Sequence, residues 1–357
     1  MKKILFIALC ALPLLLMAES MPAGYYDKAE GKKDAELKAW LRECIRAHTS
    51  IPYGKGSTNC TWNVFYYSDQ NEEGYCEDMY CDTWQKFTTP GAVVSGCNIE
   101  HSFAKSWWGG KKHDPYEDCY HLNPSNEAAN SARSNYPPGI PEKEIITSGS
   151  MKIGKRFHAG LNMDHSVFEP KDEYKGDFAR AYFYMATCYG RDLNNEQPDL
   201  PAYDKKKYVG WRTDNDQVGS KFAMQNDNYL EFQDWLIEVL LTWHRQDPVS
   251  AKELKRMDAV SDYQHNRNPF IEYPCLAEYI WGKRKGQTAS FATLKNTYDA
   301  DYLSLPADKR DGCDCTATEM VTQQQAPAVK AIKHIVNGQL VIEINGIQYN
   351  AQGARIE

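Results

Sequence analysis

The sequence reads NIEHSF at residues 98–103, DCYHLNP at residues 118–124 and NSARSN at residues 130–135. These segments bring a carboxylate, an imidazole, an amide oxygen and a guanidinium into one short span of chain. Together such groups hold one hard metal ion, activate a water molecule and neutralise the charge of a phosphate. The three segments therefore indicate an enzyme that hydrolyses phosphodiester bonds.

A helix is expected directly after Pro124, because Ser125 or Asn126 can serve as its N-cap. Asn130 and Arg133 lie three residues apart, which places them on one face of that helix. An amide ligand for a metal and a phosphate-binding guanidinium would then act side by side.

Glu100 and His101 are consecutive, and consecutive side chains of a regular strand point to opposite faces. We therefore expect the strand over residues 98–101 to end or bulge at this pair. Histidine suits the role of general base because its ordinary pKa lies near neutrality. Magnesium needs only one or two protein oxygens besides its waters. A Glu-His pair alone often arises by chance, and an asparagine such as Asn130 often only caps a turn. The prediction of a nuclease site therefore depends on finding all of these residues in this order.

At these residues the chain resembles the bacterial endonuclease I family, secreted or periplasmic nucleases with a ββα-metal (His-Me finger) site. The family pattern of Glu-His, then Asp…Leu…Pro, then Asn…Arg-Ser-Asn is met by Glu100, His101, Asp118, Leu122, Pro124, Asn130, Arg133, Ser134 and Asn135. Residues 168–170, 175–181 and 266–271 agree as well, and the resemblance spans roughly residues 22–285.

The resemblance implies His101 as the general base. It implies Glu100 and Asn130 as ligands of a Mg²⁺ ion, or of another divalent cation such as Mn²⁺ or Ca²⁺. Arg133 is implied to contact or stabilise the phosphate. The family usually has His-Asn in a stretch that reads Cys-Tyr-His-Leu here, which leaves the role of His121 open.

Three further cations are candidates for substrate binding: Lys175, Arg180 and Arg267. Buried ion pairing explains them about as well. The expected substrates are DNA and also RNA, contacted through backbone phosphates that carry no sequence information. The net charge of −7 becomes −9 without the two lysines of the N-terminal segment, whereas nucleic-acid surfaces are usually basic. Substrate binding is therefore expected to be weak and sensitive to salt.

The first eighteen residues have the features of a secretory signal. Lys2 and Lys3 precede an apolar run over residues 4–17, and Ala18 is a small residue suited to cleavage. The run is too short for a membrane span, and no later segment is apolar enough. The mature protein is expected to be secreted or periplasmic, to lack a membrane span and to be a monomer.

Ten cysteines remain after the signal, an even number that permits complete pairing in an exported protein. Four of them lie in the stretch just before the Glu-His pair, and local disulfides are expected among Cys60, Cys76, Cys81 and Cys97. A zinc site is the rival interpretation. Cys313 and Cys315 are too close together to bond easily to each other and are expected to pair elsewhere.

The hydrophobic pattern predicts an α+β domain in which helices dominate, with a small C-terminal β tail. Apolar stripes predict helices near residues 34–49, 178–185, 229–243 and 250–260, and short strands near 92–94 and 98–101. The predicted division is a signal at residues 1–18, a nuclease domain at 19–315, a linker at 316–328 and a tail at 329–357. The Asn-Gly pairs at 337–338 and 345–346 predict hairpin turns in that tail. It serves either sorting or attachment, or packs on the body as an extra hairpin.

Two other functions fit parts of the sequence. Aromatic residues make up 12% of the chain and nine are tryptophan, which also suits a secreted carbohydrate-binding or glycoside-cleaving protein. The third interpretation is an inactive protein of the same fold that still binds nucleic acid. The presence of Glu100, His101 and Asn130 argues against it.

Overall fold

The computed structural model describes residues 21–56, 58–81, 85–110, 112, 114–159, 162–190, 219–310 and 313, with four strands of the C-terminal segment. The expected signal at residues 1–18 and linker at 316–328 lie outside the described residues. The chain divides into two compact units, residues 1–314 and 315–357, and each is described by itself.

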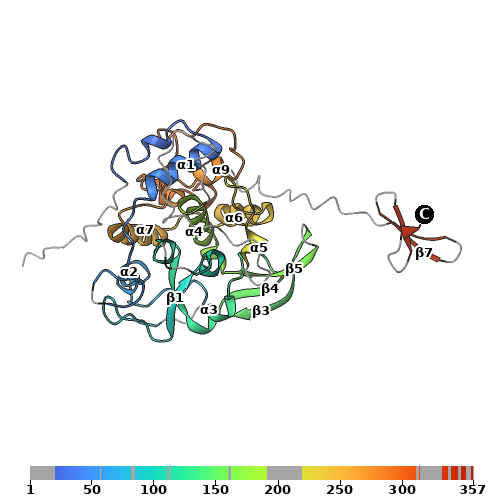
Figure 1. Cartoon of the computed structure of the whole chain (residues 1–357), viewed down its shortest axis with the longest axis horizontal. Coiled ribbons are helices and arrows are strands. Elements are labelled where there is room, and N and C mark those ends of the chain that lie inside the picture. Colours follow the sequence, from blue (N-terminus) through green and yellow to red (C-terminus); the bar gives the residue numbers. More distant parts are fainter. Residues whose placement is uncertain are drawn as a thin grey trace, which may run out of the picture. The chain divides into compact units, whose positions relative to one another are not determined.

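Two strands and one helix carry part of each of the three motif segments, and Figure 1 labels β1 and α3. Strand β1 (Cys97–His101) pairs antiparallel with β2 (Leu122–Asn126), and α3 (Glu127–Arg133) follows β2 directly. The side chain of Asn126 accepts hydrogen bonds from the backbone N–H groups of the first turn of α3, at 3.0 and 3.1 Å. The predicted helix is therefore confirmed, with Asn126 as its N-cap.

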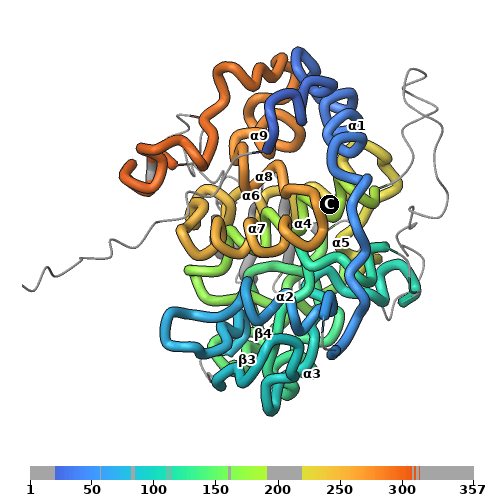
Figure 2. The backbone as a smooth tube through the Cα atoms, turned by 90° about the vertical axis from the view of Figure 1, so that its left-hand side faces the viewer, coloured from blue at the N-terminus to red at the C-terminus, as the bar shows by residue number. Residues whose placement is uncertain are grey.

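Helix α4 (Lys175–Cys188) is the centre of the first unit, because every one of its residues except Asp177 is buried. It packs against α6 (Asp234–Gln246) and α1 (Asp34–Ile45). In both views, α4, α6 and α7 (Ala251–Gln264) lie between α1 and α9 (Leu276–Ile280) on one side and α2 (Thr61–Ser68) and α3 on the other (Figures 1 and 2).

The remaining helices are short. Two are α-helical, α5 (Ser220–Ala223) and α8 (Pro269–Glu272). The 3₁₀ helices span Asp27–Ala29, Lys105–Trp108, Asp114–Tyr116, Asp172–Tyr174, Tyr302–Ser304 and Ala307–Lys309. None of the described helices is both long and apolar enough to span a membrane.

An antiparallel sheet adjoins α3. It is ordered β3 (Lys143–Ser148), β4 (Met151–His158) and β5 (Met163–Glu169). The end of β5 is buried, and the Phe168 ring lies 4.8 Å from the guanidinium carbon of Arg133. The sheet therefore packs against Arg133, the last residue of α3.

Three details of the predicted fold are wrong. The fold is not helix-rich, since the structure is 39% helical and small sheets and long connections carry much of the chain. The predicted helix near residue 229 begins only at Asp234, because Tyr229 lies in a turn where its hydroxyl donates to the carbonyl of Ile280. Residues 92–94 form a loop after Gly91, whose φ of +80° turns the chain there.

The cysteines also differ from expectation. Among the described residues one disulfide is present, between Cys275 and Cys313, so Cys313 does pair elsewhere. The disulfides expected among Cys60, Cys76, Cys81 and Cys97 are absent from the described residues. Three of these cysteines, Cys60, Cys76 and Cys97, pack with apolar side chains such as Trp62 in one core cluster. Buried thiols act there as small hydrophobic groups.

The second unit contains an antiparallel sheet in the order β6 (Ile332–Val336), β7 (Gln339–Ile344), β8 (Ile347–Asn350) and β9 (Arg355–Ile356). An Asn-Gly pair separates β6 from β7, and another separates β7 from β8. Asn-Gly pairs are typical of tight hairpins. The role of this sheet in sorting or attachment stays a prediction.

Candidate active site

Strand β1 ends at the Glu-His pair, as the sequence required. Glu100 lies opposite Asn123 and His101 lies opposite Leu122, and His101 is the last residue of the strand. Glu100 and His101 are each only 4% exposed. Both nevertheless line one cleft of about 420 Å³, to which Asn130 also contributes.

The carboxylate of Glu100 is held by two donors on the same oxygen. The Tyr80 hydroxyl and Nη1 of Arg133 each donate to Oε1 at 2.9 Å. Burial raises the pKa of Glu100 above its ordinary value, and Arg133 and Tyr80 counteract only part of that rise. Neither of these two donors contacts Oε2.

His101 is fixed by a carbonyl group and by two aromatic rings. Its Nε2 lies 3.1 Å from the carbonyl oxygen of Tyr116. Its ring stacks on Tyr53 with centroids 5.5 Å apart and lies 4.7 Å from the Tyr116 ring. Burial lowers the pKa of His101 well below its ordinary value, and nearby His121 and Lys105 add to that effect. The neutral imidazole is therefore the stable form.

Asn130 reaches the cleft from α3. Its amide nitrogen donates to Oδ1 of Asn98 at 2.7 Å. This bond uses the donor end of the amide and leaves its oxygen as an acceptor, and Glu100 lines the same cleft. Asn98 and Glu100 alternate on β1 and so share one face of the strand.

Arg133 also lines the cleft, and it is completely buried. Besides Glu100, its guanidinium donates to the carbonyl oxygen of His101 at 3.0 Å, to that of Ser102, and to the Tyr182 hydroxyl at 3.0 Å. Four acceptors converge on one cation, and two of them are backbone carbonyls at the end of β1. Arg133 thus holds the strand end that carries Glu100 and His101.

The other three predicted cations do not line this cleft. Each is engaged with carboxylates elsewhere. Lys175 lies 2.6 Å from Glu169, and Arg180 forms two 2.6 Å hydrogen bonds with Glu253. Arg267 bonds to Asp258 at 2.5 Å. These ion pairs support the structural explanation for all three, and their role in substrate binding stays a prediction.

Lys105 and Asn98 are two of the cleft residues that the sequence interpretation missed. Lys105 lines the cleft, with its ammonium 5.6 Å from the centroid of the Tyr116 ring. A single lysine in a short 3₁₀ helix gives no signal in the sequence. Asn98 carried a usable signal, because it stands two residues before Glu100 and so faces the same way.

His121 lies behind His101 rather than in the cleft. Its ring is fully buried, 5.5 Å from that of His101, and Nε2 lies 2.6 Å from the carbonyl oxygen of Pro115. Burial lowers the pKa of His121 to about 4. It packs against the ring of His101 and helps to fix it in place.

A second group of ligand-type atoms lies elsewhere in the described residues. Atoms of His48, Asp118 and Cys188 lie within 4.8 Å of one another. Each oxygen of Asp118, however, already accepts two hydrogen bonds, from Tyr120, Gln264, Tyr184 and Tyr189. No lone pair remains for an ion, so this group holds the fold together.

A profile of the endonuclease I family matches residues 34–275. Two extracellular ribonucleases, from Bacillus amyloliquefaciens and Bacillus subtilis, are 33% identical over 261 residues, covering 72% of this chain and 78% of each relative. A periplasmic deoxyribonuclease of Aeromonas hydrophila is 26% identical over 207 residues, covering 52% of this chain and 80% of the relative. Enzymes of this family generally depend on a divalent metal ion. The chain belongs to the endonuclease I family and is a nuclease that hydrolyses phosphodiester bonds.

Proposed function

We propose that the chain is an exported, monomeric endonuclease that uses a divalent metal ion and cleaves both DNA and RNA with little sequence specificity. The observation that carries this proposal is the meeting of Glu100, His101 and Asn130 at one cleft, although they come from a strand and a separate helix. The three supply the general base and two oxygen ligands that metal-assisted hydrolysis needs.

In this proposal His101 is the general base. The carbonyl of Tyr116 can only accept, so the proton of the neutral ring resides on Nε2 and the lone pair on Nδ1. Because burial keeps the ring neutral, Nδ1 can take a proton from a water molecule near neutral pH. Stacking on Tyr53 holds the ring in one orientation.

Glu100 and Asn130 fit a hard divalent cation, with Mg²⁺ as our first choice and Mn²⁺ or Ca²⁺ as alternatives. Oε2 of the carboxylate and the amide oxygen are both hard donors, and Mg²⁺ keeps waters in its other positions. A metal ion bound there supplies Lewis-acid stabilisation of the phosphate and the leaving oxygen. Arg133 acts through Glu100, by fixing the ligand carboxylate in place.

Both nucleic acids are proposed as substrates. Attack by water makes no use of a 2′-hydroxyl, so the reaction does not distinguish the two sugars. The relatives support this breadth, since two are named ribonucleases and one a deoxyribonuclease. Lys105 is the cation at the cleft that we propose to contact backbone phosphate, which carries no sequence information.

Export is supported by the names of the relatives, extracellular in two cases and periplasmic in one. N-terminal sequencing of protein recovered from outside the cytoplasm tests it. The mature chain should begin at or shortly after residue 19. Recovery of the intact N-terminus only from the cytoplasm would contradict export.

The catalytic proposal is tested on supercoiled plasmid and on single-stranded RNA, with Mg²⁺ or with EDTA. Wild-type protein should cleave both nucleic acids, and EDTA should abolish cleavage. His101→Ala should lower turnover by about a hundredfold or more, because a positioned general base contributes that much. DNA affinity, measured by fluorescence anisotropy, should stay close to that of the wild type.

Cleavage that persists in EDTA would overturn the metal dependence. Full activity of His101→Ala would show that His101 is not the base. A variant that neither folds nor binds DNA would show that His101 is a structural histidine instead.

A further inference from the structure

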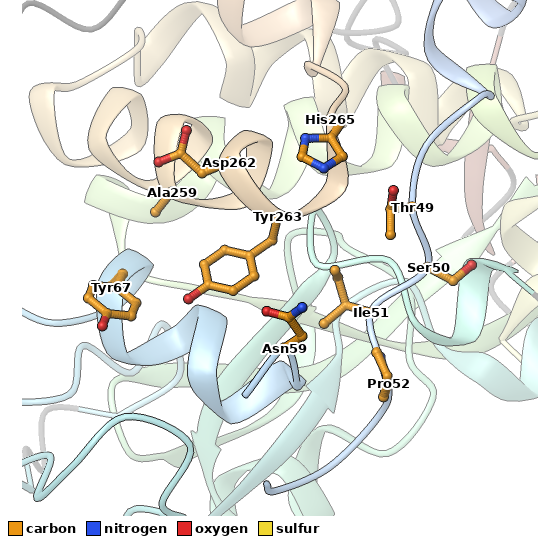
Figure 3. A pocket seen from close by; sticks show the side chains of 10 residues that line it. All are labelled: Thr49, Ser50, Ile51, Pro52, Asn59, Tyr67, Ala259, Asp262, Tyr263 and His265. Atoms are coloured by element: carbon orange, nitrogen blue, oxygen red, sulfur yellow. The ribbon is translucent and has the colours of Figure 1, made fainter. Parts of the chain in front are cut away.

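A second and larger groove, of about 730 Å³, lies on the surface of the first unit (Figure 3). Its walls are the segment over residues 49–52, the region from Asn59 to Tyr67 around α2, and the C-terminal turns of α7. Neither the predicted site residues nor those of the catalytic cleft line it. Its chemistry is therefore unexplained by the catalytic proposal.

Two tyrosines face this groove. Tyr67 is 48% exposed at the end of α2, and Tyr263 is half-buried near the end of α7. Their ring centroids lie 6.4 Å apart with an angle of 31° between the planes. The Tyr263 hydroxyl donates to Asn63 at 3.4 Å, which helps to fix its ring. The pair offers an ordered aromatic surface to solvent.

The rim of the groove is polar. Asn59, Asp262 and His265 are all exposed and line it, and Figure 3 shows their side chains around the Tyr263 ring. His265 has a φ of +62°, so α7 ends in a left-handed residue there. No lysine or arginine lines the groove among the described residues. This chemistry suits the hydrogen-bonding edge of a base and disfavours a phosphate beside Asp262.

The groove and the catalytic cleft share one segment of chain. Pro52 lines the groove, and the next residue, Tyr53, lines the cleft and stacks on His101. A nucleotide bound in the groove would therefore be a near neighbour of the phosphate at His101. Bases stack on exposed aromatic rings in proteins that bind single strands.

We propose that the groove of Tyr67 and Tyr263 binds an unpaired nucleobase next to the scissile phosphate, so that the enzyme prefers single-stranded to duplex nucleic acid. The inference rests on the proposed function. In a duplex the bases are stacked and paired inside the helix, and a base reaches such a groove only after it is unstacked. Phosphate contacts alone would give no such preference.

The test compares Tyr67→Ala and Tyr263→Ala with Phe157→Ala, whose ring is also 48% exposed but lies on β4, outside the groove. KM and kcat are measured on a single-stranded oligonucleotide and on a duplex of the same sequence. Each tyrosine variant should raise KM for the single strand about tenfold, because one stacked base contributes about that much affinity. The duplex KM should change far less, and Phe157→Ala should match the wild type on both.

A binding measurement checks stacking directly. In the His101→Ala background, a single strand that contains 2-aminopurine should lose fluorescence on binding, and Tyr263→Ala should abolish that loss while Tyr263→Phe should keep it. Should Tyr263→Ala fail to fold, the exposed Tyr67→Ala carries the test.

Unchanged single-strand KM in both tyrosine variants, or equal losses on single strand and duplex, would overturn the inference. Failure of the wild type to cleave either substrate would instead overturn the proposed function.

Discussion

Nη1 of Arg133 lies 2.9 Å from Oε1 of Glu100, and the arginine is completely buried beneath the carboxylate. The same guanidinium also bonds to backbone carbonyls at the end of β1. The geometry thus links the last residue of α3 to the strand that carries Glu100 and the proposed base, His101. Arg133 was predicted to touch phosphate, and these contacts favour a role in positioning the ligand carboxylate.

Arg133→Ala should therefore damage both the fold and the metal site. It leaves the buried Glu100 carboxylate without its cation, so unfolding free energy should fall by about 3 to 5 kcal/mol in urea denaturation. Arg156→Ala is the control, because Arg156 pairs with the exposed Glu142 and surface pairs contribute less than about 1 kcal/mol. An Arg133→Ala protein of wild-type stability that had lost only substrate affinity would restore the phosphate-binding interpretation.

Glu100→Gln should weaken metal binding while keeping the fold. The amide oxygen can still accept from Tyr80 and Arg133, but the formal negative charge is lost. We expect Mn²⁺ affinity, measured by calorimetry on the whole chain, to fall by about tenfold or more. Glu142→Gln is the matched control on an exposed side chain. An unchanged titration would remove Glu100 from the ligand set.

Much of the site could be predicted from sequence because its information is local. The N-cap at Asn126, the end of the strand at His101 and the shared face of Asn130 and Arg133 all follow from neighbours within a few residues. The contribution of Tyr53 could not be predicted, since its contact with His101 joins segments far apart in the chain.

The partners of the charged residues could not be predicted either, because they also lie far apart in the sequence. Sequence alone cannot distinguish a buried cation from a phosphate-binding one, because the partner of Arg180 is Glu253, far along the chain. The aromatic content suggested a carbohydrate-binding alternative, which the burial of the tryptophans does not support. Most of the described tryptophans belong to the core rather than to a sugar-binding surface: Trp62, Trp107, Trp108, Trp243 and Trp281.

The Cys275–Cys313 disulfide should contribute measurably to stability. It closes a loop with a sequence separation of 38 residues, for which chain-entropy reasoning gives about 4 kcal/mol. Cys275→Ser with Cys313→Ser should lower the unfolding free energy by up to about that amount, and a reducing agent should lower that of the wild type equally. Cys60→Ser is the control for the reducing agent, since Cys60 is a free thiol; its protein should respond to reduction as the wild type does. A double serine variant as stable as the wild type would contradict the prediction.

Acid should destabilise the fold in part through His165. Its ring is buried between Phe222 and Trp235, with centroids 4.9 and 5.0 Å away. Burial, together with the neighbouring His158 and Arg156, lowers the pKa of His165 to about 4. Between the ordinary value of 6.5 and about 4, the unfolded chain binds a proton that the folded chain does not. This contribution to stability is therefore complete above pH 6.5 and is lost as the pH falls toward 4.

His165→Phe should remove that part of the acid sensitivity, because phenylalanine fills a similar volume and does not titrate. The unfolding free energies at about pH 7.5 and about pH 5, measured by urea denaturation, should differ less in the variant than in the wild type, by on the order of 1 kcal/mol after allowance for solvent. His265→Phe is the control, because His265 is exposed. This variant should lose as much unfolding free energy between the two pH values as the wild type does. If His165→Phe loses as much stability in acid as the wild type, the buried ring of His165 is not a source of the acid sensitivity.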